Sequence, residues 1–245
     1  MKKLEIQTVM SIILLLAGIL SAQAQNASTI LKSVDEVMYS AKDMSGNNKI
    51  ILIDKSGKED IREATTQQKG TDKRMFRFTS PSSQAGIAVL SLPEDVMYLY
   101  LPAFGKERRI ASSAKNQNFA GTDFSYDDME SKPYSDKYTV KLLSTENDSY
   151  ILELIPISPK SDYSKIIMKV NKANFYPEVL EYYNKGNIKT KEAKYTFTKI
   201  GNYWNPEEIE MTDLKKNHKT KMLMSNVKYD QGISDEEFTV RKLKQ

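Results

Sequence analysis

The chain has 245 residues, of which 40% are hydrophobic and 28% charged, and its mean hydropathy is −0.54, as in an ordinary globular protein. It contains no cysteine and one histidine, which excludes disulfides, thiolate metal sites and a cysteine nucleophile and disfavours zinc sites and a Ser-His-Asp triad. The formal net charge of +4 is too small to predict nucleic-acid binding. By elimination, the composition favours a binding protein without a cofactor over an enzyme.

The first residues have the pattern of an export signal. Met1-Lys2-Lys3 is basic, Val9 to Leu20 is an apolar run, and Ala22-Gln23-Ala24 supplies the small residues that signal peptidase accepts. The pattern predicts a signal peptide over residues 1–24, cleaved after Ala24. The apolar run falls short of the ~20 residues that a spanning helix needs, so a retained membrane anchor is the weaker alternative. We therefore expect an exported protein in which residues 25–245 form a single domain.

A helix is predicted next, over Asn26 to Met44. Its apolar residues recur at helical spacing, which gives one apolar stripe that must lie on another element. Gly46-Asn47-Asn48 is expected to end the helix.

From Lys49 onward the pattern changes to short alternating runs separated by turn residues, which predicts strands. The connections leave no room for crossover helices, so the sheet should be antiparallel, and so many strands in one open sheet should curl. The expected fold is mainly β with few helices: a strongly curved antiparallel sheet, an unclosed half-barrel, covered by the N-terminal helix and a lid segment. The predicted strands are 49–54, 59–66, 73–79, 86–92, 96–101, 106–111, 138–143, 150–156, 164–171, 177–183, 189–199, 203–212 and 220–229.

The lid segment is the irregular stretch Asn116 to Glu130, which is rich in aromatic and acidic residues. Phe119, Phe124 and Met129 could dock onto an apolar face while the acids stay in water. A connection packed simply for stability is an equal alternative. If the segment is a lid, Phe124→Asp should weaken ligand binding and leave the fold intact, whereas unfolding of this variant would place the segment in the core.

Two arginines precede this segment and suggest how it could be held closed. Arg108 and Arg109 lie near its acids in the sequence, and Asp123 and Asp127 are the candidate partners. Surface ion pairs of this kind contribute only ~0–1 kcal/mol each, which suits a latch that opens.

Several blocks of the sequence resemble the family of outer-membrane lipoprotein-sorting proteins, the LolA-like group. The resemblance covers residues 74–130 well, and the rest of the chain matches mainly in strand spacing and length. The residues that carry it are Phe76–Pro81, Gly86–Leu90, Tyr98–Ala103, Arg108–Ile110, Phe119–Asp128 and, at the C-terminus, Ser234–Thr239.

The resemblance implies a curved, unclosed sheet covered by helices, whose hydrophobic cavity holds the acyl chains of a lipid or lipoprotein for sorting to the outer membrane. It implies a periplasmic location and no catalysis. We expect a monomer that binds a lipid or acylated lipoprotein, has membrane-bound donor and acceptor proteins, and binds neither metal nor nucleic acid. The large apolar residues that could line the cavity, with ordinary core packing as the alternative for each, are Phe76, Phe78, Leu90, Tyr98, Tyr100, Phe104, Phe119, Phe124 and Trp204.

The residues leave two alternatives to a carrier. A non-carrier sensor or assembly module that binds a protein with the same sheet is suggested by the lysine-rich stretch Asn184 to Lys228 and by the unpaired edges of an open sheet. A hydrolase is disfavoured because no nucleophile has a matched base.

His218 lies in a lysine-rich turn and is expected to be exposed.

Overall fold

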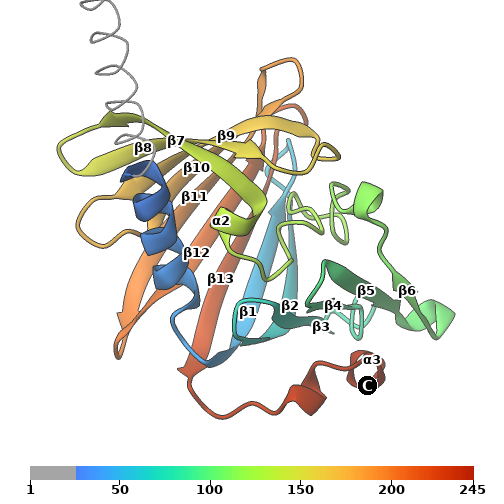
Figure 1. Cartoon of the computed structure of the whole chain (residues 1–245). Helices are drawn as coiled ribbons and strands as arrows, with labels where there is room; N and C mark the ends of the chain where they lie inside the picture. Colours follow the sequence, from blue (N-terminus) through green and yellow to red (C-terminus); the bar gives the residue numbers. More distant parts are fainter. Residues whose placement is uncertain (1–25) are drawn as a thin grey trace, which may run out of the picture.

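The computed structural model describes residues 26–245, so the predicted signal peptide lies outside the described residues. A helix over residues 26–39 is followed by a curled antiparallel sheet that does not close (Figure 1). The sheet confirms every predicted strand, with most ends shifted by a few residues. Its strands are β1 (Asp43–Ile53), β2 (Glu59–Lys69), β3 (Lys73–Ser80), β4 (Ala88–Leu92), β5 (Val96–Leu101), β6 (Lys106–Arg109), β7 (Tyr138–Thr145), β8 (Ser149–Pro156), β9 (Tyr163–Asn171), β10 (Pro177–Asn184), β11 (Lys189–Ile200), β12 (Tyr203–Asp213) and β13 (His218–Tyr229).

The strand order is β6-β5-β4-β3-β2-β1-β13-β12-β11-β10-β9-β8-β7. Neighbours in the sheet are neighbours in the chain, except that β1 pairs with β13. The two edge strands, β6 and β7, are therefore consecutive in the chain although they lie at opposite ends of the sheet. Residues 110–137 join them, and we call this connection the strap. It contains η2 (Ser112–Ala114) and α2 (Tyr134–Lys137).

The predicted end of the N-terminal helix is wrong. The helix ends at residue 39, and Gly46-Asn47-Asn48 belongs to β1. A Cβ atom on Gly46 would lie 3.2 Å from Cγ2 of Val227 on β13. The glycine therefore permits close approach of two strands and does not terminate a helix.

The concave face of the sheet carries the main core. The helix lies on this face and buries Ile30, Leu31 and Val34 in the same cluster as residues from most strands (Figure 1). Phe76 and Phe78 of β3 and Val89 of β4 belong to this cluster. The apolar stripe predicted for the helix is thus the stripe that covers the sheet.

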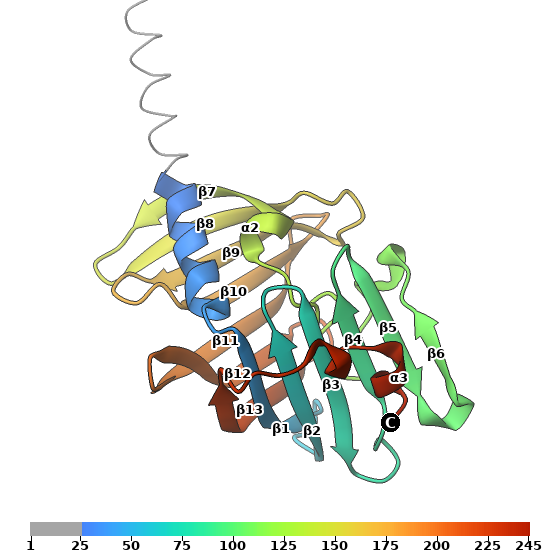
Figure 2. The same ribbon diagram turned by 60° about the horizontal axis from the view of Figure 1, so that its bottom comes forward.

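The outer face carries a second, smaller core under the C-terminus. Met75, Ala88 and Leu90 pack there against Phe238 and Leu243. These last two residues belong to a C-terminal segment that contains η3 (Asp235–Glu237) and α3 (Val240–Leu243) and crosses β3 and β4 (Figure 2). Arg77 of β3 holds the end of the chain, because its guanidinium donates to the carbonyls of Lys242 and Leu243 at 2.6 and 3.1 Å.

The lysine-rich stretch forms ion pairs both between and within strands. Lys189 pairs with Glu181 and Glu192, and Lys221 pairs with Glu208 and Glu210. Similar pairs join Lys194 to Glu192, Lys216 to Asp213 and Lys219 to Glu210. Opposite charges on adjacent strands stabilise the pairing of a sheet. These pairs engage five of the ten lysines in the stretch that suggested a protein-binding surface.

These ion pairs predict a loss of stability in acid. Hydrogen bonds from Lys189 lower the pKa of Glu192 below its ordinary 4.5. Burial alone would raise the pKa of Glu210, but hydrogen bonds from Lys219 and Lys221 outweigh it and lower that pKa as well. A lowered folded-state pKa means that the stabilisation is complete above the unfolded pKa and is lost as the pH falls through the folded pKa.

We therefore expect the Tm to fall between about pH 5 and pH 3. Glu210→Gln should be less stable than the parent chain at neutral pH, and this difference should shrink as the pH falls. Thermal unfolding followed by circular dichroism measures both. A difference in Tm that is constant across this range would exclude a role for the ionised Glu210.

Candidate ligand-binding cavity

A cavity of about 170 Å³ lies between the concave face of the sheet, the N-terminal helix and the strap. Its volume is more than ten times the roughly 10–15 Å³ that one water molecule requires. Val37 and Met38 of the helix, Phe124 of the strap, and Ile209 and Met222 of the sheet give it apolar walls. The hollow can therefore accept a hydrophobic ligand.

The polar side chains in the cavity wall bond to one another. Asn48 donates its side-chain amide to Oγ1 of Thr66 at 2.7 Å, and Nη2 of Arg74 donates to Oε1 of Gln68 at 2.5 Å. Because these groups already have hydrogen-bond partners within the protein, a ligand does not have to supply polar groups for them.

Tyrosines form another part of the wall, and burial keeps them neutral. Burial raises the pKa of Tyr195 to about 12 and raises the pKa values of Tyr134, Tyr138 and Tyr182 above their ordinary range. At neutral pH these phenols are uncharged, so this part of the wall repels no apolar chain.

The strap packs on the concave face mainly through aromatic contacts. The ring of Phe119 lies 5.7 Å from that of Phe76, 5.5 Å from that of Phe78 and 5.6 Å from that of Tyr126, measured between centroids. Phe119 is 1% exposed and Phe124 is 5% exposed. The middle of the strap is therefore part of the core, as in the alternative of a connection packed for stability. For this reason we now expect Phe124→Asp to destabilise the fold as well as the cavity wall.

The predicted latch is not formed in this structure. Arg108 and Arg109 are exposed on the edge strand β6, and within residues 26–245 neither pairs with Asp123 or Asp127. The strap leaves β6 and turns over the concave face, so Asp123 meets the distant strand β13, and Asp127 meets a lysine at the other end of the strap. Lys137 lies 2.6 Å from Asp127 Oδ2 and holds that carboxylate.

Asp123 is held by β13. Thr220 donates its hydroxyl to Asp123 Oδ2 at 2.7 Å, and Nδ1 of His218 lies 2.6 Å from the same oxygen. The expectation that His218 is exposed is therefore wrong: its side chain is 23% exposed and lies against a carboxylate that is 2% exposed.

Two basic residues that the sequence analysis missed hold the strap by its backbone. Arg62 of β2 donates from Nη1 to the carbonyl oxygen of Ala120 at 2.6 Å, and Lys191 of β11 donates to that of Asp123 at 2.7 Å. Both are buried. Arg62 and Ala64 share the inward face of β2, where a charged residue is unusual. This is the one feature of the sequence that could have identified Arg62 as an anchor.

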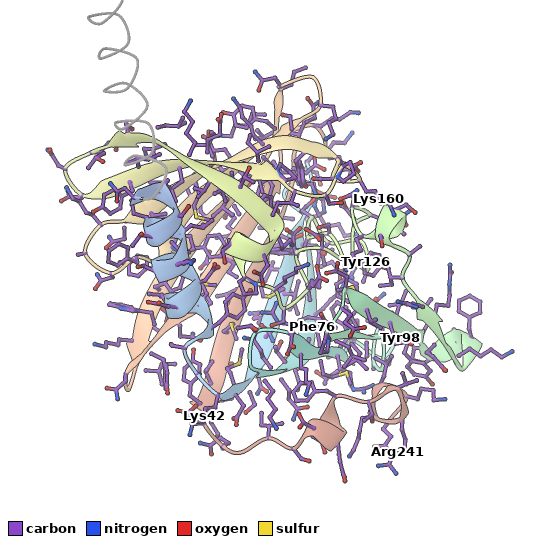
Figure 3. The ribbon with its side chains drawn as sticks, in the orientation of Figure 1. Lys42, Phe76, Tyr98, Tyr126, Lys160 and Arg241 are labelled. Carbon is purple, nitrogen blue, oxygen red and sulfur yellow. The ribbon has the colours of Figure 1, made fainter. Side chains whose placement is uncertain are left out.

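The nine residues predicted to line the cavity divide among several places. Phe76, Phe124 and Trp204 line it, and Phe78 and Phe119 pack beside Phe76 in the main core. Leu90, Tyr98 and Tyr100 pack instead in the outer core under the C-terminus, because they alternate with the inward residues Val89 and Leu99. Figure 3 shows Phe76 near the middle of the molecule and Tyr98 nearer to α3. Phe104 lies in η1 (Pro102–Phe104) at the tip of the β5–β6 hairpin and is 74% exposed.

The contact between Arg62 and the strap leads to a prediction. Arg62→Ala should lower the free energy of unfolding by about 1.5–3 kcal/mol, because it removes the charge-assisted hydrogen bond that the buried guanidinium donates to the partly buried carbonyl oxygen of Ala120. Arg108→Ala should change it by less than about 0.5 kcal/mol, because Arg108 is exposed. Urea unfolding of both variants measures the two values. Equal effects would mean that the anchoring role of Arg62 is misassigned.

The fold and the cavity can be compared with known proteins. The model of a protein family described as "Uncharacterized protein" matches residues 70–245. No curated protein matches the chain significantly. Among solved structures, a DUF1329 family protein from Desulfovibrio piger is 26% identical, with a TM-score of 0.84 over 90% of this chain and 99% of its own.

Two further structures share the fold. A domain described as an outer membrane lipoprotein-sorting protein, from Vibrio parahaemolyticus, is 24% identical and has a TM-score of 0.84 over 91% of this chain and 100% of its own. A LolA superfamily protein from Nitrosomonas europaea is 24% identical, with a TM-score of 0.75 over 88% of this chain and 98% of its own. The chain belongs to the family whose model matches residues 70–245, and its fold is that of the LolA-like outer-membrane lipoprotein-sorting proteins.

Proposed function

We propose that the chain is a periplasmic carrier that holds a lipid, or the acyl chains of a lipoprotein, in the cavity beneath the strap. The observation that supports this most is the apolar hollow on the concave face of an unclosed sheet. An acyl chain gains about 0.8 kcal/mol for each methylene removed from water, so binding needs apolar area and few polar contacts. The tyrosine and methionine walls supply such area.

The proposed location rests on two observations. The first residues have the pattern of a cleavable export signal. The chain shares its fold with a protein named for lipoprotein sorting at the outer membrane. Among residues 26–245 no helix is long and apolar enough to cross a membrane.

Binding without catalysis fits the chemistry of the cavity. Its amide and guanidinium groups bond to one another, and the single histidine of the chain lies against Asp123. Among the described residues, no group of three or more His, Asp or Glu side chains is placed to hold a metal ion. These arrangements support a role as a container.

A pair of variants on one strand tests the proposal. Met222 of β13 lines the cavity, whereas its neighbour Leu223 points to the opposite face of the sheet. Met222→Trp should fill part of the hollow and weaken binding of a fluorescent long-chain fatty acid by about tenfold or more, a loss of roughly 1.4 kcal/mol. Leu223→Trp is the matched control and should bind like the parent chain.

Fluorescence titration gives the Kd of each protein, and circular dichroism shows that each is folded. If the parent chain binds no fatty acid, the proposal is wrong. If both tryptophan variants bind as tightly as the parent chain, the ligand lies elsewhere.

A further inference from the structure

A second hollow, of about 300 Å³, adjoins the apolar cavity. It is bounded by the strap and by the connection between β8 and β9, where Lys160 lies above Tyr126 in Figure 3. Five residues line both hollows: Asp127, Glu130, Lys132, Lys137 and Tyr138. The two hollows therefore lie on either side of these residues, and a molecule held in the apolar cavity would have to extend past them to reach the second hollow.

Charged residues line both hollows, but they make up a larger share of the wall of the second one. Four lysines and four carboxylates contribute to its wall, so the charges balance. They are Lys115, Lys132, Lys137, Lys160, Asp95, Asp127, Glu130 and Asp136.

Six of these eight charges form three ion pairs. Lys115 pairs with Glu130, Lys132 with Asp95, and Lys137 with Asp127, each at 2.6 Å. Two charges of opposite sign remain. Within residues 26–245, neither the ammonium of Lys160 nor the carboxylate of Asp136 has an ion-pair partner, and both residues are exposed at the hollow. The site thus offers one free cation and one free anion beside an apolar cavity.

We propose that this hollow receives the zwitterionic headgroup of a phospholipid whose acyl chains occupy the apolar cavity. The phosphate faces Lys160 and the ammonium faces Asp136, while the three internal pairs stay intact. A headgroup with a phosphate but no ammonium satisfies only Lys160, and a neutral diacylglycerol satisfies neither charge. The inference rests on the proposed function, because a headgroup binds here only if the cavity holds the acyl chains of the same lipid.

Displacement of a neutral apolar fluorophore, N-phenylnaphthylamine, tests the inference. The competitors are phosphatidylethanolamine, phosphatidylglycerol and diacylglycerol with identical short acyl chains. We expect phosphatidylethanolamine to displace the fluorophore at a concentration about two- to fivefold lower than phosphatidylglycerol, the range of one partly exposed ion pair, and diacylglycerol to be the weakest competitor.

Two variants test the contributions of Asp136 and Lys160 separately. Asp136→Asn should abolish the difference between the two phospholipids, and Lys160→Gln should weaken both by about two- to fivefold relative to diacylglycerol. The matched control is Lys55→Gln in the exposed β1–β2 turn, which should preserve the full order. None of the three changes a residue of the apolar cavity, so direct binding of the fluorophore should stay the same.

The possible failures can be distinguished. If all three lipids compete equally, or if the order survives both variants, the headgroup inference is wrong while the acyl-binding proposal stands. If neither the fluorophore nor any lipid binds, the proposed function itself fails.

Discussion

Replacing Phe119 by alanine is expected to lower the free energy of unfolding by about 3–5 kcal/mol, because it empties a fully buried ring position in the main core. Phe119 is 1% exposed and lies in contact with three other aromatic rings. Its loss removes the ring contacts that join the strap to Phe76 and Phe78 of β3. Chemical unfolding followed by tryptophan fluorescence measures the change.

Phe104→Ala is the matched control for this prediction. Phe104 is the same residue type but is 74% exposed, so the same truncation should cost less than about 0.5 kcal/mol. A Phe119→Ala variant as stable as the parent chain would contradict the packing of the strap and would restore the hypothesis of a loosely docked lid.

Lys115→Met is expected to destabilise the chain by about 3–5 kcal/mol, because it leaves the carboxylate of Glu130 buried without its partner. The two groups lie 2.6 Å apart, and their side chains are 9% and 5% exposed. Both belong to the strap, so the pair closes it upon itself.

The double variant Lys115→Met with Glu130→Leu separates the ion pair from the packing. Removing both charges should recover most of the lost stability, since a hydrophobic pair of similar volume often replaces a buried ion pair at little cost. A double-mutant cycle from urea unfolding gives the coupling energy. Additive losses in the double variant would show that the two side chains act independently.

The strand pattern of this chain was predictable from local sequence. Runs such as Val96–Leu101 alternate between two faces and are bounded by turn residues such as Pro93-Glu94-Asp95, so both length and boundaries appear in the sequence. The pairing of β1 with β13 was not visible, because it joins segments more than 150 residues apart. That pairing makes β6 and β7 the edges and draws the strap across the concave face.

The local sequence is ambiguous where one residue type has two structural roles. Gly46 looks like a helix stop, but it lies where Val227 of a neighbouring strand approaches closely. Phe76 and Tyr98 both lie on alternating strands, yet one faces the cavity side and the other faces the C-terminal segment. A single sequence shows that two residues share a face but does not show which face is concave.

The anchors of the strap are long-range contacts between polar groups of the side chains and the backbone. His218 is separated from Asp123 by 95 residues, and Arg62 from Ala120 by 58. No periodicity links such positions. The sequence suggested arginines and acids as the latch because they were close along the chain, whereas the fold selects partners that are close across the sheet.

Native mass spectrometry of the chain purified from cells tests the central claim most directly. The account predicts a bound species of lipid mass on the parent chain and on Leu223→Trp, and its loss or marked reduction on Met222→Trp. A parent chain that carries no such species and acquires none when incubated with lipid, or a species retained equally by Met222→Trp, would contradict the claim that this cavity holds an acyl chain.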